Sequence, residues 1–263
     1  MASPEQIIDE CKELDIKGDL GDALKLLGNA LREKPDAVLF YERGFRYEDL
    51  GDYESALADY SAAIQLQVPP KMLIARGGLL CHCLNQPRSG LEDFERALDL
   101  SPQSVVAHKH ICLCYQLLDR KEEALKHAMW LVNHEPDDAE AHLCLGQCLL
   151  AESRFDIAIQ ELQIATRLDP SSSNAWSSLS RAFRKEHRLP EALTCLRKSI
   201  ELKQSTSDLM SLASLLLELQ EPEKATEILQ SVRKFDLTEG QILLVNGFLN
   251  MAQGMLGVEN SAS

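Results

Sequence analysis

The sequence predicts an all-α protein made of stacked helix pairs, an α-solenoid, and three repeating patterns indicate it. Small residues recur in steps of 33 or 34 at Ala23, Ala56, Gly90, Ala124, Ala158, Ala192 and Ala225. Twelve residues before each of them stands another small residue: Cys11, Gly44, Gly78, Cys112, Gly146, Ser180 and Ala213. Prolines follow the same rhythm at Pro35, Pro69, Pro102, Pro136 and Pro170. A period of about 34 residues is typical of helix-pair repeats, so the whole chain is expected to be one array of them.

Within each repeat the apolar residues follow helical spacing. In the fifth repeat His142, Leu145 and Leu149 share one face of a first helix, and Ala158 and Leu162 share one face of a second. The small residues of the two ladders let these helices approach closely, because a bulky side chain there would force them apart. Each repeat is therefore predicted to be a helix–turn–helix.

Seven such repeats are expected over residues 1–237. Their predicted ranges are 4–36, 37–70, 71–104, 105–138, 139–172, 173–205 and 206–237. A C-terminal capping helix is expected at 238–256, and residues 257–263 are expected to form a disordered tail.

The two ends of the array carry helix-start signals. Ser3–Gln6 and Thr238–Gln241 both have the pattern of a capping box, and Pro4 stands at a first helical position. The last helix is apolar for a cap, with the run Ile242–Val245. We expect this run to be buried against the seventh repeat, and the alternative is that it forms a dimer contact or a partner site.

Composition narrows the classes of function. The net charge is −14, with 41 acidic and 27 basic residues, which argues against nucleic-acid partners and anionic membrane surfaces. No apolar run reaches the roughly 18 residues of a membrane span, and the N-terminus lacks a signal pattern. A cytoplasmic protein with reduced cysteines is therefore expected.

The repeats resemble the tetratricopeptide repeat, whose pattern runs W-x2-L-G-x2-Y, then A-x3-F, then P. In the sixth repeat Trp176, Leu179, Ser180 and Phe183 match the first part. The second repeat matches it with Phe40, Gly44 and Tyr47, followed by Ala56 and Tyr60. The resemblance implies a right-handed superhelix with a concave groove lined by the first helices. His108 and His142 depart from the pattern, because an aromatic residue is usual there.

The resemblance also implies a function, namely a scaffold or adaptor that binds a partner peptide or protein segment in the groove, without catalysis or a cofactor. Groove residues are expected on the first helices, at fixed offsets from the small residue of each. They are Tyr41, Phe45, Leu79, His82, Lys109, Leu113, Gln116, Leu143, Gln147, Arg181, Arg184 and Lys185.

Charge singles out the sixth repeat. Residues 171–206 carry seven basic and three acidic side chains, a net +4 in a chain of −14. Because Arg181, Arg184 and Lys185 fall on the predicted groove face, an acidic segment or a C-terminal carboxylate is a candidate ligand. The alternative is a solvated face in which Lys185 pairs with Glu218.

Histidines and cysteines are concentrated between the fourth and fifth repeats. His110, Cys114, Cys144 and Cys148 form a Cys3His set that suits zinc, as a structural or sensor site. The competing interpretation is that the cysteines are small core residues. No catalytic site is expected, because no known nucleophile or metalloenzyme spacing occurs. We expect a monomer or a weak homodimer, the latter through the C-terminal helix.

Overall fold

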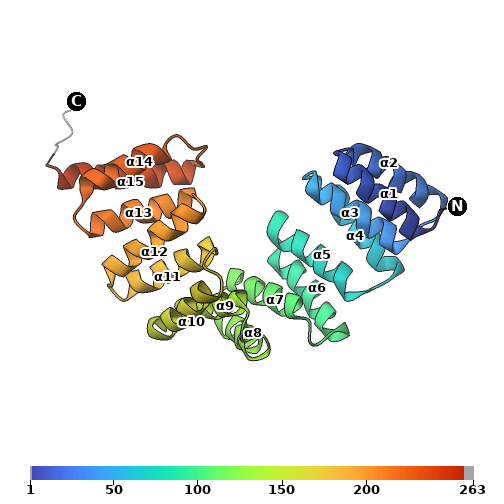
Figure 1. Cartoon of the computed structure of the whole chain (residues 1–263), viewed down its shortest axis with the longest axis horizontal. Helices are drawn as coiled ribbons and strands as arrows, with labels where there is room; N and C mark the ends of the chain where they lie inside the picture. The colour runs from blue at the N-terminus through green and yellow to red at the C-terminus, as the bar shows by residue number, and fades with distance from the viewer. Residues whose placement is uncertain (1, 258–263) are drawn as a thin grey trace. The chain divides into compact units, whose positions relative to one another are not determined.

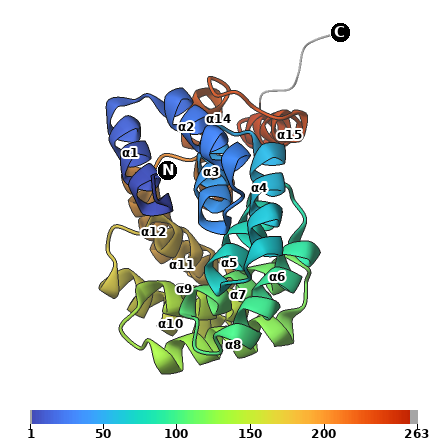
Figure 2. The ribbon, with the colours of Figure 1, turned by 90° about the vertical axis from the view of Figure 1, so that its right-hand side faces the viewer.

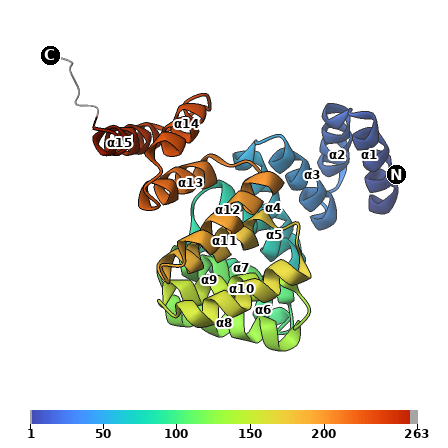
Figure 3. The ribbon, with the colours of Figure 1, turned by 60° about the vertical axis from the view of Figure 1, so that its left-hand side comes forward.

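The computed structural model describes residues 2–257, which contain helices and no strands. The chain divides into two compact units, Met1–Leu131 and Val132–Ser263, called here the N-terminal and C-terminal units. Figure 1 labels the helices, Figure 2 brings those of the N-terminal unit toward the viewer, and Figure 3 brings those of the C-terminal unit forward. In each unit the helices follow one another as stacked pairs, so the fold is an all-α solenoid, as the ladders predict.

The helices of the N-terminal unit are α1 (Pro4–Lys17), α2 (Leu20–Glu33), α3 (Ala37–Asp49), α4 (Tyr53–Leu66), α5 (Pro70–Gly78), the π-helical turn η1 (Leu79–Cys83), α6 (Pro87–Leu100) and α7 (Val105–Leu117). Helix α8 (Lys121–His134) begins in this unit and ends in the next. The C-terminal unit contains α9 (Ala139–Ala151), α10 (Phe155–Leu168), α11 (Ser173–Lys185), α12 (Leu189–Leu202), α13 (Thr206–Glu218), α14 (Pro222–Val232) and α15 (Glu239–Met255). We number the pairs from one (α1–α2) to seven (α13–α14), and η1 continues the first helix of pair three.

The two small-residue ladders meet at the seam between the helices of each pair. In pair six the Ser180 hydroxyl donates to the Ala192 carbonyl oxygen at 2.7 Å, across twelve residues. The thiols of Cys11 and Cys112 make the same contact with the carbonyls twelve residues on, at 3.7 and 3.5 Å. A hydrogen-bonding side chain in the first helix therefore satisfies a backbone oxygen of the second where the helices touch.

Pair three corrects the prediction that Gly78 is its seam residue. A Cβ atom added to Gly78 would meet nothing within 4 Å, whereas one on Gly77 would lie 3.0 Å from the Gly90 carbonyl oxygen and 2.8 Å from Phe94. The two seam residues are thus 13 apart here, not 12. The cause is η1, because a π-helical turn places one additional residue in a helix.

The turn inside every pair contains one residue with a left-handed backbone. These are Gly18, Gly51, Asn85, Asp119, Ser153, His187 and Gln220, with φ between 52° and 81°. Their spacing is again 33 or 34 residues, so the same sharp turn reverses the chain seven times among the described residues. Only two of the seven are glycines, although this conformation favours glycine.

The histidines that replace the usual aromatic residue are buried, as expected for core positions. His142 Nε2 lies 2.9 Å from the Pro136 carbonyl oxygen, and His108 Nε2 lies 3.4 Å from that of Pro102. In pair six Trp176 Nε1 donates to the Pro170 carbonyl at 3.0 Å. In pairs four, five and six the position therefore holds a flat ring with an N–H donor, and histidine supplies both.

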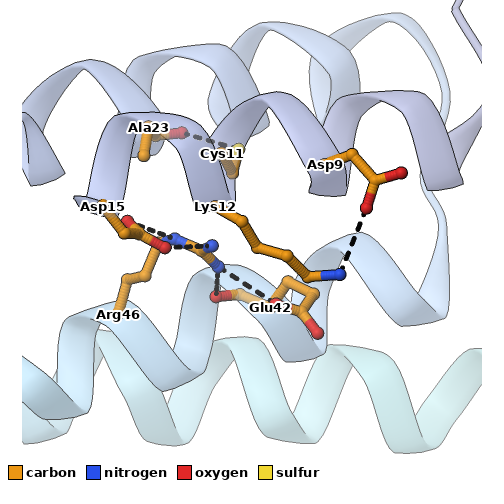
Figure 4. A network of polar contacts seen from close by, with 7 residues as sticks. All are labelled: Asp9, Cys11, Lys12, Asp15, Ala23, Glu42 and Arg46. Atoms are coloured by element: carbon orange, nitrogen blue, oxygen red, sulfur yellow. Dashed lines mark hydrogen bonds and ion pairs between the residues drawn. The ribbon is translucent and has the colours of Figure 1, made fainter. Parts of the chain in front are cut away.

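A buried arginine joins α1 and α3, which are the first helices of pairs one and two (Figure 4). The Arg46 guanidinium on α3 donates to both carboxylate oxygens of Asp15 on α1, at 2.7 and 3.2 Å, and to the side chain and carbonyl of Glu42. Its side chain is only 4% exposed, while Asp15 remains partly in solvent. The bidentate geometry fixes how α1 lies on α3, which a single-point contact would not do.

The last helix, α15, covers pair seven with only part of its apolar surface. The capping boxes at Ser3 and Thr238 both form as predicted. Val245, Leu249 and Ala252 are buried in α15, where Val245 and Leu249 pack in a cluster with residues of α13 and α14. The expectation that the run Ile242–Val245 is buried is wrong for three of its four residues, because Ile242, Leu243 and Leu244 are 45%, 72% and 52% exposed. Burial against the seventh repeat therefore accounts for one face of α15, and the opposite face stays open to solvent. The predicted tail, apart from Gly257, lies outside the described residues.

Candidate peptide-binding groove

The predicted groove residues of pairs two and three differ widely in exposure. Phe45 is half exposed and Tyr41 is partly buried, with its ring 5.8 Å from that of Tyr60. His82 is exposed and lies 3.5 Å from His110, from Nε2 to Nδ1. Leu79 is fully buried against Ala56 and Tyr60, so its assignment to the groove is wrong. The π-helical turn is the physical reason, because it changes which side chains of this helix face the seam.

The predicted groove residues of pairs four and five are partly buried. Lys109, Leu113 and Gln116 on α7 are all intermediate in exposure, and Gln116 lies near the Cys112 sulfur at 3.9 Å. In pair five Leu143 packs against the core, and the Gln147 amide donates to Ser178 at 3.1 Å. Each of these residues contributes only part of its surface to a ligand face.

The three predicted groove cations of pair six differ in their contacts. Arg184 is held by Glu218 of α13 through its Nε, at 3.0 and 3.1 Å to the two carboxylate oxygens, and its Nη2 donates to Ser214 at 2.7 Å. Glu218 therefore pairs with Arg184, and the predicted alternative pairing with Lys185 is wrong. Arg181 and Lys185 are exposed, and neither has an ion-pair partner within residues 2–257.

These cations line a surface depression in the C-terminal unit. It measures about 770 Å³ and is bordered by Arg181, Arg184, Lys185, His187 and Glu218, with Leu189 at its edge. One carboxylate stands against three permanent cations, and that carboxylate is already bound by Arg184. The electrostatics of the depression therefore favour an anionic group from outside.

A second depression adjoins the first, and sequence analysis did not predict it. It measures about 360 Å³ and is lined by residues of α11, α13 and α15 in the C-terminal unit. Its lining residues are Arg184, Ser207, Met210, Ser211, Ser214, Gln241, Leu244 and Phe248. The sequence carries the signal, because Met210 stands three residues before Ala213, as Lys109 does before Cys112, and Leu244 follows Met210 by 34 residues.

The histidine and cysteine set gives no support to the zinc alternative. The Cys114 thiol lies 3.5 Å from the Cys81 sulfur, and burial raises the pKa of Cys114. Among the residues that the structure describes, no three His, Cys, Asp or Glu side chains are grouped so that they could hold a metal ion. Cys114 and Cys148 are buried, in keeping with small core residues.

Within residues 2–257, no helix is long and apolar enough to span a bilayer.

Comparison with known proteins identifies the repeats. Family models described as tetratricopeptide repeat match residues 37–67, 118–173 and 149–206. Anaphase-promoting complex subunit 7 of Dictyostelium discoideum is 27% identical over 158 residues, which are 60% of this chain. The chain spans about a quarter, 27%, of the length of that relative.

Solved structures share the fold over most of the chain. A tetratricopeptide repeat protein from Parabacteroides merdae aligns with a TM-score of 0.78 and 18% identity, covering 95% of this chain and 98% of that one. The anaphase-promoting complex assembly Cut9–Hcn1 aligns with a TM-score of 0.75 and 16% identity, covering 92% of this chain and 48% of that one. These structures share the solenoid fold, and the family models show that residues 37–67 and 118–206 of this chain are tetratricopeptide repeats.

Proposed function

We propose that this chain is a non-catalytic adaptor that binds an acidic peptide segment of a partner protein on the first helices of its C-terminal unit. The observation that carries the proposal is the pair Arg181 and Lys185, two exposed cations without ion-pair partners in the described chain, in the one basic repeat of an acidic protein. A relative that matches 60% of this chain is a subunit of a complex, anaphase-promoting complex subunit 7. That supports a role in protein–protein interaction.

Net charge makes this proposal specific. A protein of −14 repels acidic peptides over most of its surface, so capture of one requires a local site that overcomes the repulsion. Arginine and lysine side chains at the rim of a concave surface give charge-assisted hydrogen bonds to carboxylates. Arg184, already fixed by Glu218 and Ser214, supports the site by holding α11 against α13.

The test uses a fluorescein-labelled octaglutamate peptide and fluorescence anisotropy at low and moderate salt. The double variant R181E/K185E is expected to weaken binding at least tenfold, since it removes two charge-assisted contacts and adds two repulsive charges. The matched control is R197E/K203E, which changes the same net charge in the same repeat at two exposed residues of the second helix and its end. Equal loss in both variants, or loss in neither, would contradict the proposed site.

A second candidate function is self-association through α15. Leu243 and Met251 are 72% and 57% exposed on one face of this helix, and residues 240–257 carry no charge. An exposed apolar face of this kind is a common protein interface. Sedimentation velocity over a concentration series would decide: a dimer that dissociates in L243S/M251S supports it, and a monomer at all concentrations removes it.

A further inference from the structure

We propose that the depression between α13 and α15 binds an apolar side chain of the same peptide, so that the ligand is an acidic segment with one large aliphatic or aromatic residue within it. This inference rests on the proposed function, because the two depressions share Arg184 and would hold neighbouring parts of one ligand. It assigns α15 a role beyond covering the end of the array.

The groove register continues into α15 and changes its chemistry along the way. One residue after the small residue of each helix, α11, α13 and α15 have Arg181, Ser214 and Phe248. Three residues before that small residue, they have Ser177, Met210 and Leu244. Both rows run from polar or cationic residues in pair six to apolar residues in the last helix. A ligand that follows the rows therefore meets cations first and an apolar surface second.

The second depression has the size and composition for a single side chain. Its volume of about 360 Å³ lies near the lower end of the range for small-ligand pockets, roughly 300–1,000 Å³. Met210, Leu244 and Phe248 provide its apolar walls. Leu244 is 52% exposed, and contact with a ligand side chain would remove this apolar surface from water.

Hydroxyl groups line the α13 side of the second depression. Ser207 and Ser211 are one turn apart on α13, both line the apolar depression, and neither side chain has a hydrogen-bond partner within the described residues. Ser214, the next hydroxyl on this face, already accepts from Arg184 at 2.7 Å. Open hydroxyls both donate and accept, so they suit the backbone of an extended peptide. That is the reason for choosing a peptide as the occupant.

The experiment compares two peptides on three proteins. The probes are the labelled octaglutamate peptide with one central residue replaced by phenylalanine, and the same peptide with serine there. The protein variants are L244S and, as the matched control, L243S on the neighbouring residue of α15, which is more exposed and does not line the depression. Both substitutions remove the same side chain from the same helix.

The wild-type protein is expected to bind the phenylalanine peptide about tenfold more tightly than the serine peptide, in line with burial of one large apolar side chain. L244S should lose this preference without changing affinity for the serine peptide, and L243S should keep it. If R181E/K185E weakens both peptides but the wild type does not distinguish them, the inference fails and the proposed function stands. If the wild type binds neither peptide, both fail.

Discussion

Pairs four and five have the same register one repeat apart, yet they fill their seams in opposite ways. In pair four Cys112 stands at the seam and the residue sixteen positions on is Ala128. In pair five Gly146 faces Leu162, whose Cγ would lie 2.5 Å from an added Cβ. The small and large partners have exchanged sides, while the helices still pack closely. What the fold maintains is therefore the summed volume of the two side chains, not the identity of either.

The two pairs also differ in the partner of the histidine that contacts the proline carbonyl. His108 Nδ1 lies 2.9 Å from His127 Nδ1 in pair four, and the His108 ring stacks on Trp130 at 3.6 Å. His142 Nδ1 lies 2.7 Å from a Glu161 oxygen in pair five. Two imidazoles share one hydrogen bond in pair four, whereas His142 lies between two oxygen acceptors in pair five. The same position therefore has a basic partner in one repeat and an acidic partner in the other.

The largest expected effect comes from moving the pair-four seam into pair five. L162A should cost about 2–5 kcal/mol by leaving a cavity, and G146C about 1–3 kcal/mol by overpacking against Leu162. The double variant should lose less unfolding free energy than the sum of the two single losses, because the cysteine occupies the volume that leucine leaves. Urea unfolding of all four proteins measures this coupling, and strict additivity would remove the volume rule.

Pair three extends the rule to two adjacent glycines. G77A should destabilise the protein by about 1–3 kcal/mol, since its methyl group would press on the Gly90 carbonyl and Phe94. G78A is the matched control and should be neutral or stabilising by up to about 1 kcal/mol, because alanine favours a helix and open space surrounds the site. Thermal melts would distinguish them. The reverse order would place the seam at Gly78 after all.

Acid sensitivity sharpens the comparison of the histidines. Burial, with a smaller contribution from His108, lowers the pKa of His127 to about 4 from 6.5. The unfolded chain thus binds this proton more readily, so its contribution to stability is complete above pH 6.5 and is lost as the pH falls toward 4. With allowance for partial exposure, we expect a loss of about 1–2 kcal/mol at pH 5. H127E should reduce this loss by giving His108 a carboxylate partner, and H127Q should reduce it without adding a charge.

The smallest effect is expected from the reverse exchange. E161H would place a second imidazole beside His142 and should add about 1 kcal/mol of instability between pH 7 and pH 5. E161Q removes the carboxylate without adding a titrating group, so it separates loss of the hydrogen bond from acid repulsion. Urea midpoints at the two pH values provide the measurement. An E161H protein with the pH dependence of E161Q would show that repulsion at this position is negligible.

The periodic features of this fold were predictable because each repeat imposes the same local requirement. Seam residues such as Ser180 could be identified from spacing alone, since a close approach needs a small side chain in every pair. The π-helical turn could not, because it adds a residue inside one helix and leaves the flanking steps, Ala56 to Gly90 to Ala124, at 34. The doublet Gly77–Gly78 was compatible with both registers.

The candidate site was predictable in part for the same reason. Arg181 and Lys185 follow from the offsets, and so do Met210 and Leu244 when the offsets are carried forward. The pairing of Arg184 rather than Lys185 with Glu218 depends on side-chain reach between two helices, which spacing does not specify. Cys114 and Cys81 are in contact although 33 residues separate them in the sequence. This spacing, one short of the usual 34, reflects the π-helical turn that contains Cys81.

The seven reversals of the chain have a practical consequence. Asn85, Asp119, Ser153 and Gln220 hold side chains in a backbone conformation that glycine adopts without penalty, and all four are solvent-exposed. Replacing each of them with glycine should relieve the backbone strain and leave the ligand-facing and seam surfaces unchanged. Because the sites are far apart in the chain, their small gains should accumulate and give a heat-tolerant version of this scaffold for biochemical work.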